Sequence, residues 1–255
     1  MISNSSFSRR GFLSMLGVGA ASTLASCAST APGPSGNIVT YRDGVALRND
    51  GLPPVGGDPE AAMMYGAVED GGYLIPAIPY ERINPRYYRQ RVVDPTGERP
   101  GTIVVDTPSR FLYLVEPGGS AMRYGVGIGR DGFAWSGEGV IQWRQKWPKW
   151  TPPDEMVARQ PQLVKYSIAN GGMPPGLTNP LGARALYIFQ NGQDTIYRIH
   201  GSPEWWTIGK SVSSGCVRLM NQDIIDLHSR VVDGTPIVVT SLPAPMSQGS
   251  IAPGV

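Results

Sequence analysis

The sequence predicts a mainly β protein, built as a β-sandwich or barrel-like sheet with one helix late in the chain. Two observations lead to this fold class. The 255 residues include 33 Gly and 24 Pro, a content typical of loop-rich β proteins and unlike that of a helical bundle. Short apolar and β-branched segments, separated by turn residues, recur between residues 102 and 240. A hydrophobic content of 41% suits one well-formed core.

The first 26 residues are predicted to be an export signal. Arg9 and Arg10 precede a weakly apolar stretch that is shorter than the roughly 20 apolar residues of a membrane-spanning helix. The paired arginines resemble a twin-arginine signal, and an ordinary secretory signal is the alternative. Leu24-Ala25-Ser26-Cys27 resembles a lipobox, in which Cys27 is lipidated. Cleavage by ordinary signal peptidase is the alternative here. Ala28 after the cysteine favours, by resemblance, a lipid anchor in the outer membrane and a periplasmic location.

Composition divides the mature chain into four parts. Residues 27–72 are rich in Pro, Gly, Ala, Ser and Asn and predict a flexible tether. Residues 73–100 predict an irregular N-terminal arm, residues 101–241 the folded domain, and residues 242–255 a disordered tail. A monomer is expected.

Turn residues punctuate the expected strands of this domain. Thr107-Pro108-Ser109-Arg110 connects a first hairpin, and Asn191-Gly192-Gln193 connects a later one. Asp106, at a strand end, is expected to cap a turn. The strands expected from the pattern are Thr102–Asp106, Phe111–Val115, Ala121–Gly129, Val140–Trp143, Leu186–Gln190, Thr195–His200 and Thr235–Thr240.

One helix and one long loop complete the expected organisation. Asn221 is the expected N-cap, Asp223 suits the first turn, and apolar residues at helical spacing continue to Val232 before Gly234. A proline-rich segment between Trp143 and Arg184 predicts a long loop of the kind that often shapes a binding site.

Charge and metal-ligand content exclude some functions. The formal net charge is +2 with no basic stripe, which gives no reason to propose a nucleic-acid partner. The residues suited to soft-metal or thiol chemistry are Cys27, Cys216, His200 and His228. No pair of them has metal-ligand spacing, so neither a metal nor another cofactor is expected.

His200 and Cys216 are the candidate reactive pair. His200 ends an expected strand, where its side chain can project into a cleft. Cys216 lies just before the expected helix, and the positive end of a helix dipole lowers a thiol pKa. Gly215 permits a tight turn that can aim two backbone N–H groups at one point. A thiolate beside an imidazole is suited to acyl transfer.

Several segments resemble the L,D-transpeptidase (YkuD) family. They are His200-Gly201-Ser202, Ser213-Ser214-Gly215-Cys216-Val217-Arg218-Leu219, Val104-Val105-Asp106, Gly125–Gly129 and Asn179-Pro180-Leu181-Gly182. The resemblance implies a mainly β catalytic domain that acts on the tetrapeptide stem of peptidoglycan, between the third residue and D-alanine. It assigns Cys216 as nucleophile and His200 as general base. It also assigns the Gly201 carbonyl to orient the imidazole, and the Gly215 and Cys216 amides to an oxyanion hole.

Substrate-binding residues follow less directly from the resemblance. The expected substrate-binding residues are Ser213, Ser214, Arg218, Ser202 and Trp205, and Ser213 and Arg218 either support the site or contact substrate. Many relatives have a histidine where this chain has Ser214, so the role of that histidine is absent or replaced here. Trp205, with the neighbouring tryptophan, predicts either an apolar wall over the stem or packing beneath a loop. His228 is expected at the boundary of the helix and not at the site.

The expected reaction leaves the acceptor open. Cys216 forms a thioester with release of D-alanine, and an amine of another stem, a lysine of an envelope protein, or water then accepts the acyl group. Water as acceptor makes the protein an L,D-carboxypeptidase, and hydrolysis of existing cross-links is a further variant. The alternatives from other classes are a non-catalytic wall-binding lipoprotein and a cysteine peptidase or amidase of another family.

Overall fold

The structure is a computed structural model that describes residues 39–42, 45–48, 58–129, 135–213 and 215–241. For residues 39–42, 45–48 and 212–213 the description is of the backbone alone. The predicted export signal, Cys27 and the predicted tail lie outside the described residues.

A nine-stranded mixed sheet forms the body of the domain, which confirms the mainly β class. Two neighbouring pairs, β12–β14 and β15–β6, are parallel, and the other pairs are antiparallel. In spatial order the strands are β14 (Val217–Met220), β12 (Gln193–Ser202), β11 (Arg184–Gln190), β10 (Gly137–Lys146), β15 (Thr235–Thr240), β6 (Ile103–Asp106), β7 (Phe111–Glu116), β8 (Ser120–Gly125) and β5 (Gln90–Val93). The site described below lies at the β14 end of this sheet.

The two predicted hairpins are confirmed. β6 and β7 pair with Asp106 opposite Phe111, and the Asp106 carboxylate accepts a hydrogen bond from the Ser109 backbone, as expected of a turn cap. β11 and β12 are joined by Asn191 and Gly192, which both have positive φ. That conformation matches the twist of antiparallel strands and explains the Asn-Gly pair.

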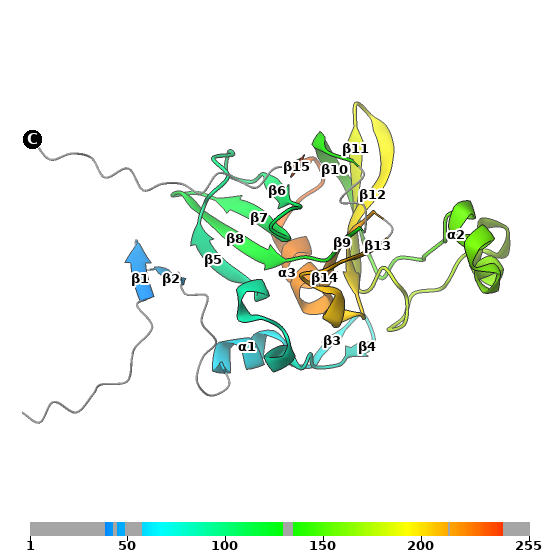
Figure 1. Cartoon of the computed structure of the whole chain (residues 1–255), viewed down its shortest axis with the longest axis horizontal. Coiled ribbons are helices and arrows are strands. Elements are labelled where there is room, and N and C mark those ends of the chain that lie inside the picture. Colours follow the sequence, from blue (N-terminus) through cyan, green and yellow to red (C-terminus); the bar gives the residue numbers. More distant parts are fainter. Residues whose placement is uncertain (1–38, 43–44, 49–57, 130–134, 214, 242–255) are drawn as a thin grey trace, which may run out of the picture. The chain divides into compact units, whose positions relative to one another are not determined.

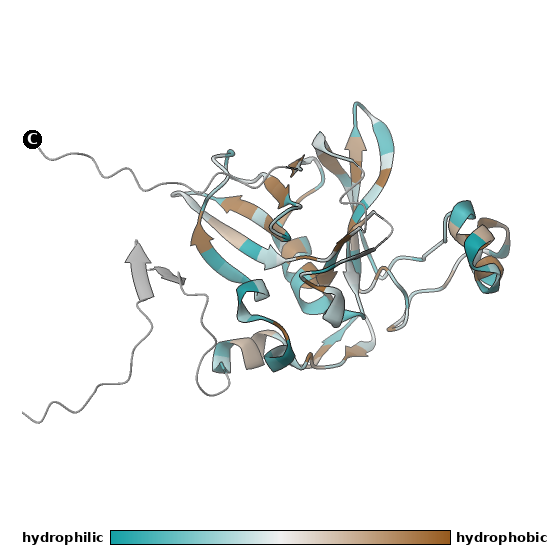
Figure 2. Cartoon of the chain, viewed as in Figure 1, coloured by the Kyte–Doolittle hydropathy of each residue, from teal (hydrophilic) through white to brown (hydrophobic). Residues whose placement is uncertain are grey.

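Helix α3 (Asn221–Arg230) covers one face of the sheet, packing on β11, β12 and β14 (Figure 1). Ile224 and Leu227 of the helix are fully buried among apolar strand residues, and Figure 2 shows the apolar segments concentrated in the strands. The strand residues of this core that have no exposure are Ile103, Val105, Leu112, Tyr124, Ile141, Leu186, Ile188, Ile199, Val217 and Leu219.

The expected boundaries of this helix need correction. Its N-cap is Met220, which makes no side-chain cap, and its last residue is Arg230. The Asn221 side chain does not cap the helix, because its oxygen accepts a hydrogen bond from the Ala183 backbone at 2.9 Å. Asn221 therefore ties the helix to the chain segment that enters β11.

The end of the predicted tether is ordered, so the expected boundary at residue 72 is wrong. Helix α1 (Pro59–Met64) begins after Asp58, whose carboxylate caps it, and β3 (Val68–Asp70) pairs with β4 (Tyr73–Ile75). Two 3-10 turns, η1 (Tyr80–Arg82) and η2 (Pro85–Tyr87), then lead into edge strand β5. This arm has its own core with part of the catalytic domain, made of Ala61, Tyr65, Ile78, Ile83, Tyr88, Ile208 and Met220.

The proline-rich segment is an excursion between β10 and β11 that contains short helices. They are α2 (Asp154–Arg159), η3 (Pro161–Tyr166) and η4 (Ile168–Asn170). A bridge between Trp150 and Met173 closes the excursion, and the buried Asn179 donates hydrogen bonds to the carbonyls of Pro148 and Pro174. Strand β10 runs to Lys146, so Trp143 lies on the sheet and not on this loop.

The described residues also form three two-stranded sheets. They are β1 (Val39–Arg42) with β2 (Val45–Arg48), β3 with β4, and β9 (Ile128–Gly129) with β13 (Ser211–Ser213). The last of these borders the site, because Gly127, next to β9, bridges to Arg218 of β14.

Candidate active site

The alternation of side chains along the strands places Cys216 and His200 on one face of the sheet. β12 and β14 are parallel neighbours in which Ile199 pairs with Val217 and His200 with Arg218. Ile199 and Val217 are fully buried in the α3-side core. Because side chains alternate along a strand, His200 and Arg218 point to the opposite face, and so does Cys216 at the entry to β14. Cys216 and His200 are diagonal neighbours on that face, a separation that side chains can bridge.

Cys216 lies in a different environment from the one expected of a helix start. The four residues of β14 separate it from α3, so the helix dipole does not act on its sulfur. Burial raises the pKa of the Cys216 thiol, and this outweighs a hydrogen bond from the Arg198 backbone and the charges of Arg198 and Arg218, which lower it. The prediction of a lowered thiol pKa was therefore wrong.

Gly215 has a conformation that suits the turn before the cysteine. Its φ is +118°, and an added Cβ would lie 3.0 Å from the ring of Tyr197. A side chain is disfavoured there both by the backbone angle and by the close ring. The glycine therefore lets the chain turn sharply at the point where Cys216 enters the strand.

His200 is held as a neutral imidazole with a defined tautomer. Its side chain is buried, and its Nδ1 lies 2.6 Å from the Gly201 carbonyl oxygen. A carbonyl can only accept, so Nδ1 carries the hydrogen and Nε2 keeps its lone pair. Burial lowers the pKa of His200 to about 4, and the nearby positive charge of Arg218 lowers it further. The hydrogen bond to Gly201 raises the pKa but does not offset these two effects. Nε2 is thus available to accept a proton near neutral pH.

A tight packing arrangement fixes the Gly201 carbonyl. A Cβ on Gly201 would lie 2.4 Å from the Asn221 side-chain oxygen and 2.8 Å from a methyl of Ile224. Gly182 is equally close to Asn221, at 2.2 Å from a hypothetical Cβ. Both positions therefore require glycine, because the buried Asn221 side chain fills the space against the strand end.

Arg218 is anchored by an ion pair beside the candidate pair. Its Nη1 lies 2.7 Å from the Glu204 carboxylate, in a salt bridge whose acidic side chain is 45% exposed. Glu204 is placed by Ser202, whose hydroxyl accepts a hydrogen bond from the Glu204 backbone at 3.1 Å. Ser202 is itself buried, and its hydroxyl holds the turn that carries Glu204.

The remaining predicted substrate residues have different placements. Trp205, in η5 (Trp205–Thr207), packs against the arm core and has the Arg82 guanidinium 5.1 Å from its ring centroid, which matches the packing alternative. The next tryptophan, Trp206, is 51% exposed. Ser213 belongs to β13 by its backbone, and Ser214 lies outside the described residues.

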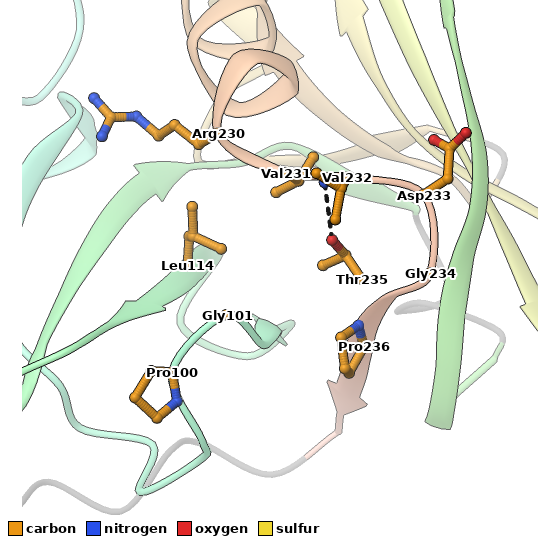
Figure 3. A pocket seen from close by; sticks show the side chains of 10 residues that line it. All are labelled: Pro100, Gly101, Leu114, Arg230, Val231, Val232, Asp233, Gly234, Thr235 and Pro236. Atoms are coloured by element: carbon orange, nitrogen blue, oxygen red, sulfur yellow. Dashed lines mark hydrogen bonds between the residues drawn. The ribbon is translucent and has the colours of Figure 1, made fainter.

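Other candidate groups lie apart from this pair. His228 is half-buried in α3, as expected of a boundary residue. Within the described ranges, no three His, Cys, Asp or Glu residues gather to hold a metal ion, and no helix has the length and apolar character to cross a bilayer. A pocket of about 280 Å³ lies where α3 leads into β15 (Figure 3), lined by residues 230–236 together with Pro100, Gly101 and Leu114. Neither Cys216 nor His200 lines this pocket.

Sequence reasoning missed three residues that shape the site. Arg198 contacts Cys216, Glu204 anchors Arg218, and Asn221 braces Gly201. A signal existed for Arg198, because it lies two positions before His200 in the same strand and must share its face. Glu204 and Asn221 act through contacts that only the folded chain reveals.

Comparisons with known proteins identify the family of the chain. Residues 100–239 match the YkuD family model, described as the L,D-transpeptidase catalytic domain. Among curated proteins, the chain is 32% identical to the "Probable L,D-transpeptidase YcfS" of Escherichia coli K12 over 158 residues, covering 60% of this chain and 48% of that protein. It is 31% identical to the "Probable L,D-transpeptidase ErfK/SrfK" of the same organism, with the same coverage. The chain thus spans about half the length of these curated relatives.

Solved structures give weaker likenesses. The "Crystal structure of a Probable carnitine operon oxidoreductase caia from Brucella melitensis" is 44% identical, covers 64% of this chain and 99% of its own, and has a TM-score of 0.43. The "L,D-transpeptidase from Mycobacterium smegmatis" is 17% identical, covers 55% of this chain and 58% of its own, and has a TM-score of 0.38. At TM-scores below 0.5, neither likeness bears on fold or function.

Proposed function

The chain belongs to the L,D-transpeptidase catalytic domain family, and we propose that it is a peptidoglycan L,D-transpeptidase that works through a thioester on Cys216. The donor is a tetrapeptide stem, which is cleaved between its third residue and D-alanine. The observation that carries this proposal is the placement of Cys216 and His200 on one face of adjacent strands, with His200 Nδ1 bonded to the Gly201 carbonyl.

The first half-reaction starts from a neutral thiol and a neutral imidazole. Burial disfavours charge on both groups, since it raises the thiol pKa and lowers that of His200. As the sulfur bonds to the stem carbonyl carbon, its proton passes to Nε2 of His200. The imidazolium then gives that proton to the departing amine of D-alanine, and the thioester remains on Cys216.

The transition state needs a site for negative charge on the carbonyl oxygen. We assign this role to the backbone N–H groups of Gly215 and Cys216, at the sharp turn that the positive φ of Gly215 creates. Arg218 lies on the same face and adds positive charge near the reacting atoms. Its salt bridge with Glu204 fixes where that charge stands.

The second half-reaction transfers the acyl group to an amine. His200 Nε2 takes a proton from the attacking amine, the carbon–sulfur bond breaks, and the proton returns to the sulfur. The acceptor is the side-chain amine of another stem, or a lysine of an envelope protein. We place the reaction in the periplasm, with residues 1–26 as the export signal and lipidated Cys27 as an anchor in the outer membrane.

The proposal is tested by following both products of the reaction. The purified protein is incubated with a tetrapeptide muropeptide, with and without an amine acceptor, and products are separated by liquid chromatography. The proposal expects D-alanine and a cross-linked dimer from the wild type and neither from Cys216→Ala. D-alanine with a tripeptide alone would make the protein an L,D-carboxypeptidase. No D-alanine from a folded wild type, with wall binding intact, would make it a binding protein.

A further inference from the structure

A row of side chains leads across the sheet from Cys216 to an exposed tryptophan. Trp143 of β10 pairs with Tyr187 of β11, and Tyr187 pairs with Arg198 of β12. Since Ile199 pairs with Val217, Cys216 stands beside Arg198 on the same face. The row crosses three gaps between strands, or about 14 Å at the usual strand spacing.

The row is rigid before any ligand arrives. The rings of Trp143 and Tyr187 stack with centroids 3.5 Å apart and planes within 9°. The Arg198 guanidinium covers the other side of Tyr187 at 4.4 Å and is itself held by two bonds of 2.7 Å to the Asp194 carboxylate. A surface fixed in this way loses little conformational entropy on binding.

The indole at the end of the row is the part open to solvent. Trp143 is 40% exposed, and because one ring face lies on Tyr187, its open area is the opposite face and the ring edge. A single exposed aromatic residue is ordinary on a protein surface. The flat stacking and the alignment with the nucleophile are what distinguish Trp143 from such residues.

We propose that Trp143, backed by Tyr187 and Arg198, is a saccharide subsite that binds the amino-sugar ring to which the donor stem is attached. The inference rests on the proposed transpeptidase function. A pyranose ring has a face of C–H groups, and such a face packs well on a flat, immobile aromatic ring.

The length of the donor stem supports a sugar ring as the ligand at Trp143. Three extended residues, from the scissile carbonyl back to the start of the stem, span about 10 Å. The group that links the stem to the sugar adds the remaining few ångströms. A stem bound with its third residue at Cys216 and laid along the row therefore brings its sugar to Trp143.

The test compares two donors that differ only in the sugar. D-alanine release from a disaccharide tetrapeptide and from the free tetrapeptide is measured for the wild type, Trp143→Ala, Trp143→Tyr and the control Val93→Ala. Val93 is a surface residue of comparable exposure, 42%, on edge strand β5 at the far end of the sheet. Trp143→Ala is expected to raise KM for the disaccharide donor about tenfold and to change the free tetrapeptide less than twofold. Trp143→Tyr should restore most of the loss, and Val93→Ala should change neither donor.

Binding to an inactive protein separates this inference from the reaction. Calorimetric titration of Cys216→Ala with each donor should show tighter binding of the disaccharide form by about tenfold, and Trp143→Ala added to Cys216→Ala should abolish that difference. Equal binding of both donors, or equal losses on both in Trp143→Ala, overturns the subsite. A wild type that releases no D-alanine from either donor contradicts the proposed function instead, while the titration still decides whether Trp143 binds the sugar.

Discussion

The two faces of the sheet at its β14 end differ in the side chains that they carry. On the α3 side, Leu186, Ile199, Val217 and Leu219 are fully buried against the helix. On the other side, the same strands present the buried His200 and the half-buried Cys216. One face is apolar packing, and the other holds polar groups in surroundings that disfavour their charged forms.

The difference shows how a small domain holds reactive groups in place. Each core residue alternates with a site residue along one strand, so packing on the α3 side sets the backbone position of the side chains opposite. The position of the site side chains therefore depends on the packing of the opposite face. Substitutions on the site face should lower activity, and substitutions on the α3 face should lower stability.

The largest effect is expected from Cys216→Ala. Loss of the proposed nucleophile should lower the rate of D-alanine release by at least about 10⁴-fold, because the proposed thioester forms on its sulfur. The melting temperature should stay within a few degrees of the wild type, since the change removes one atom from a half-buried position. Steady-state release assays and thermal unfolding check the two parts, and retained turnover would break the assignment of this face as the active one.

On the core face, Ile199→Ala should have the opposite signature. Removing a fully buried side chain beneath His200 is expected to lower the free energy of unfolding by about 2–5 kcal/mol. Activity per folded molecule, measured at low temperature, should fall only a few-fold. Urea unfolding measures the loss of stability, and kinetic assays on the same protein measure the activity. A loss of activity as deep as that of Cys216→Ala, without destabilisation, would erase the distinction between the faces.

Asp223, which lies on α3 against Tyr65 and Arg89 of the N-terminal arm, gives stability a pH dependence. Burial raises the pKa of Asp223 to about 7, against the lowering effect of Arg89. The folded state therefore holds this proton more tightly than the unfolded state, and the wild type should lose stability through this group as pH rises from about 4 to 7. Asp223→Asn removes that loss, so its stability relative to the wild type should grow by roughly 2–4 kcal/mol over that range. Urea unfolding at several pH values would show a constant difference if the burial of this carboxyl were misassigned.

The smallest effect is expected from Glu204→Gln. This change removes the charge that anchors Arg218 but leaves its hydrogen-bonding oxygen. Because the acidic partner is 45% exposed, stability should change by less than about 1 kcal/mol. Displacement of Arg218 should lower kcat/KM about three- to tenfold. An unchanged kcat/KM would show that the position of the Arg218 charge does not matter to the reaction.

The strands of the core face could be predicted from sequence, whereas the environment of the site could not. Alternation and turn residues located both hairpins, since Asn191-Gly192 and the Asp106 turn are local signals. β14 was missed because it is only four residues long and pairs in parallel with β12, so no hairpin turn marks the pairing. The raised thiol pKa arises from burial, which no local pattern encodes.

The N-terminal arm, too, could be predicted from sequence only in part. Residues 27–72 were expected to form a flexible tether because they are rich in Pro, Gly, Ala, Ser and Asn. Yet Asp58 caps α1, Pro59 begins it, and Tyr65 is fully buried against the catalytic domain. The cap and the proline were readable as a helix start, but the partner that buries Tyr65 was not.

The central claim is that Cys216 becomes acylated by the donor stem, and intact-protein mass spectrometry tests it most directly. The protein is mixed with a tetrapeptide donor in the absence of an amine acceptor, quenched in acid and weighed beside Cys216→Ala. The expected result is a mass increase equal to the donor without D-alanine, present on the wild type, absent from Cys216→Ala and located on Cys216 by peptide mapping. A folded wild type that keeps its original mass and releases no D-alanine would contradict the claim.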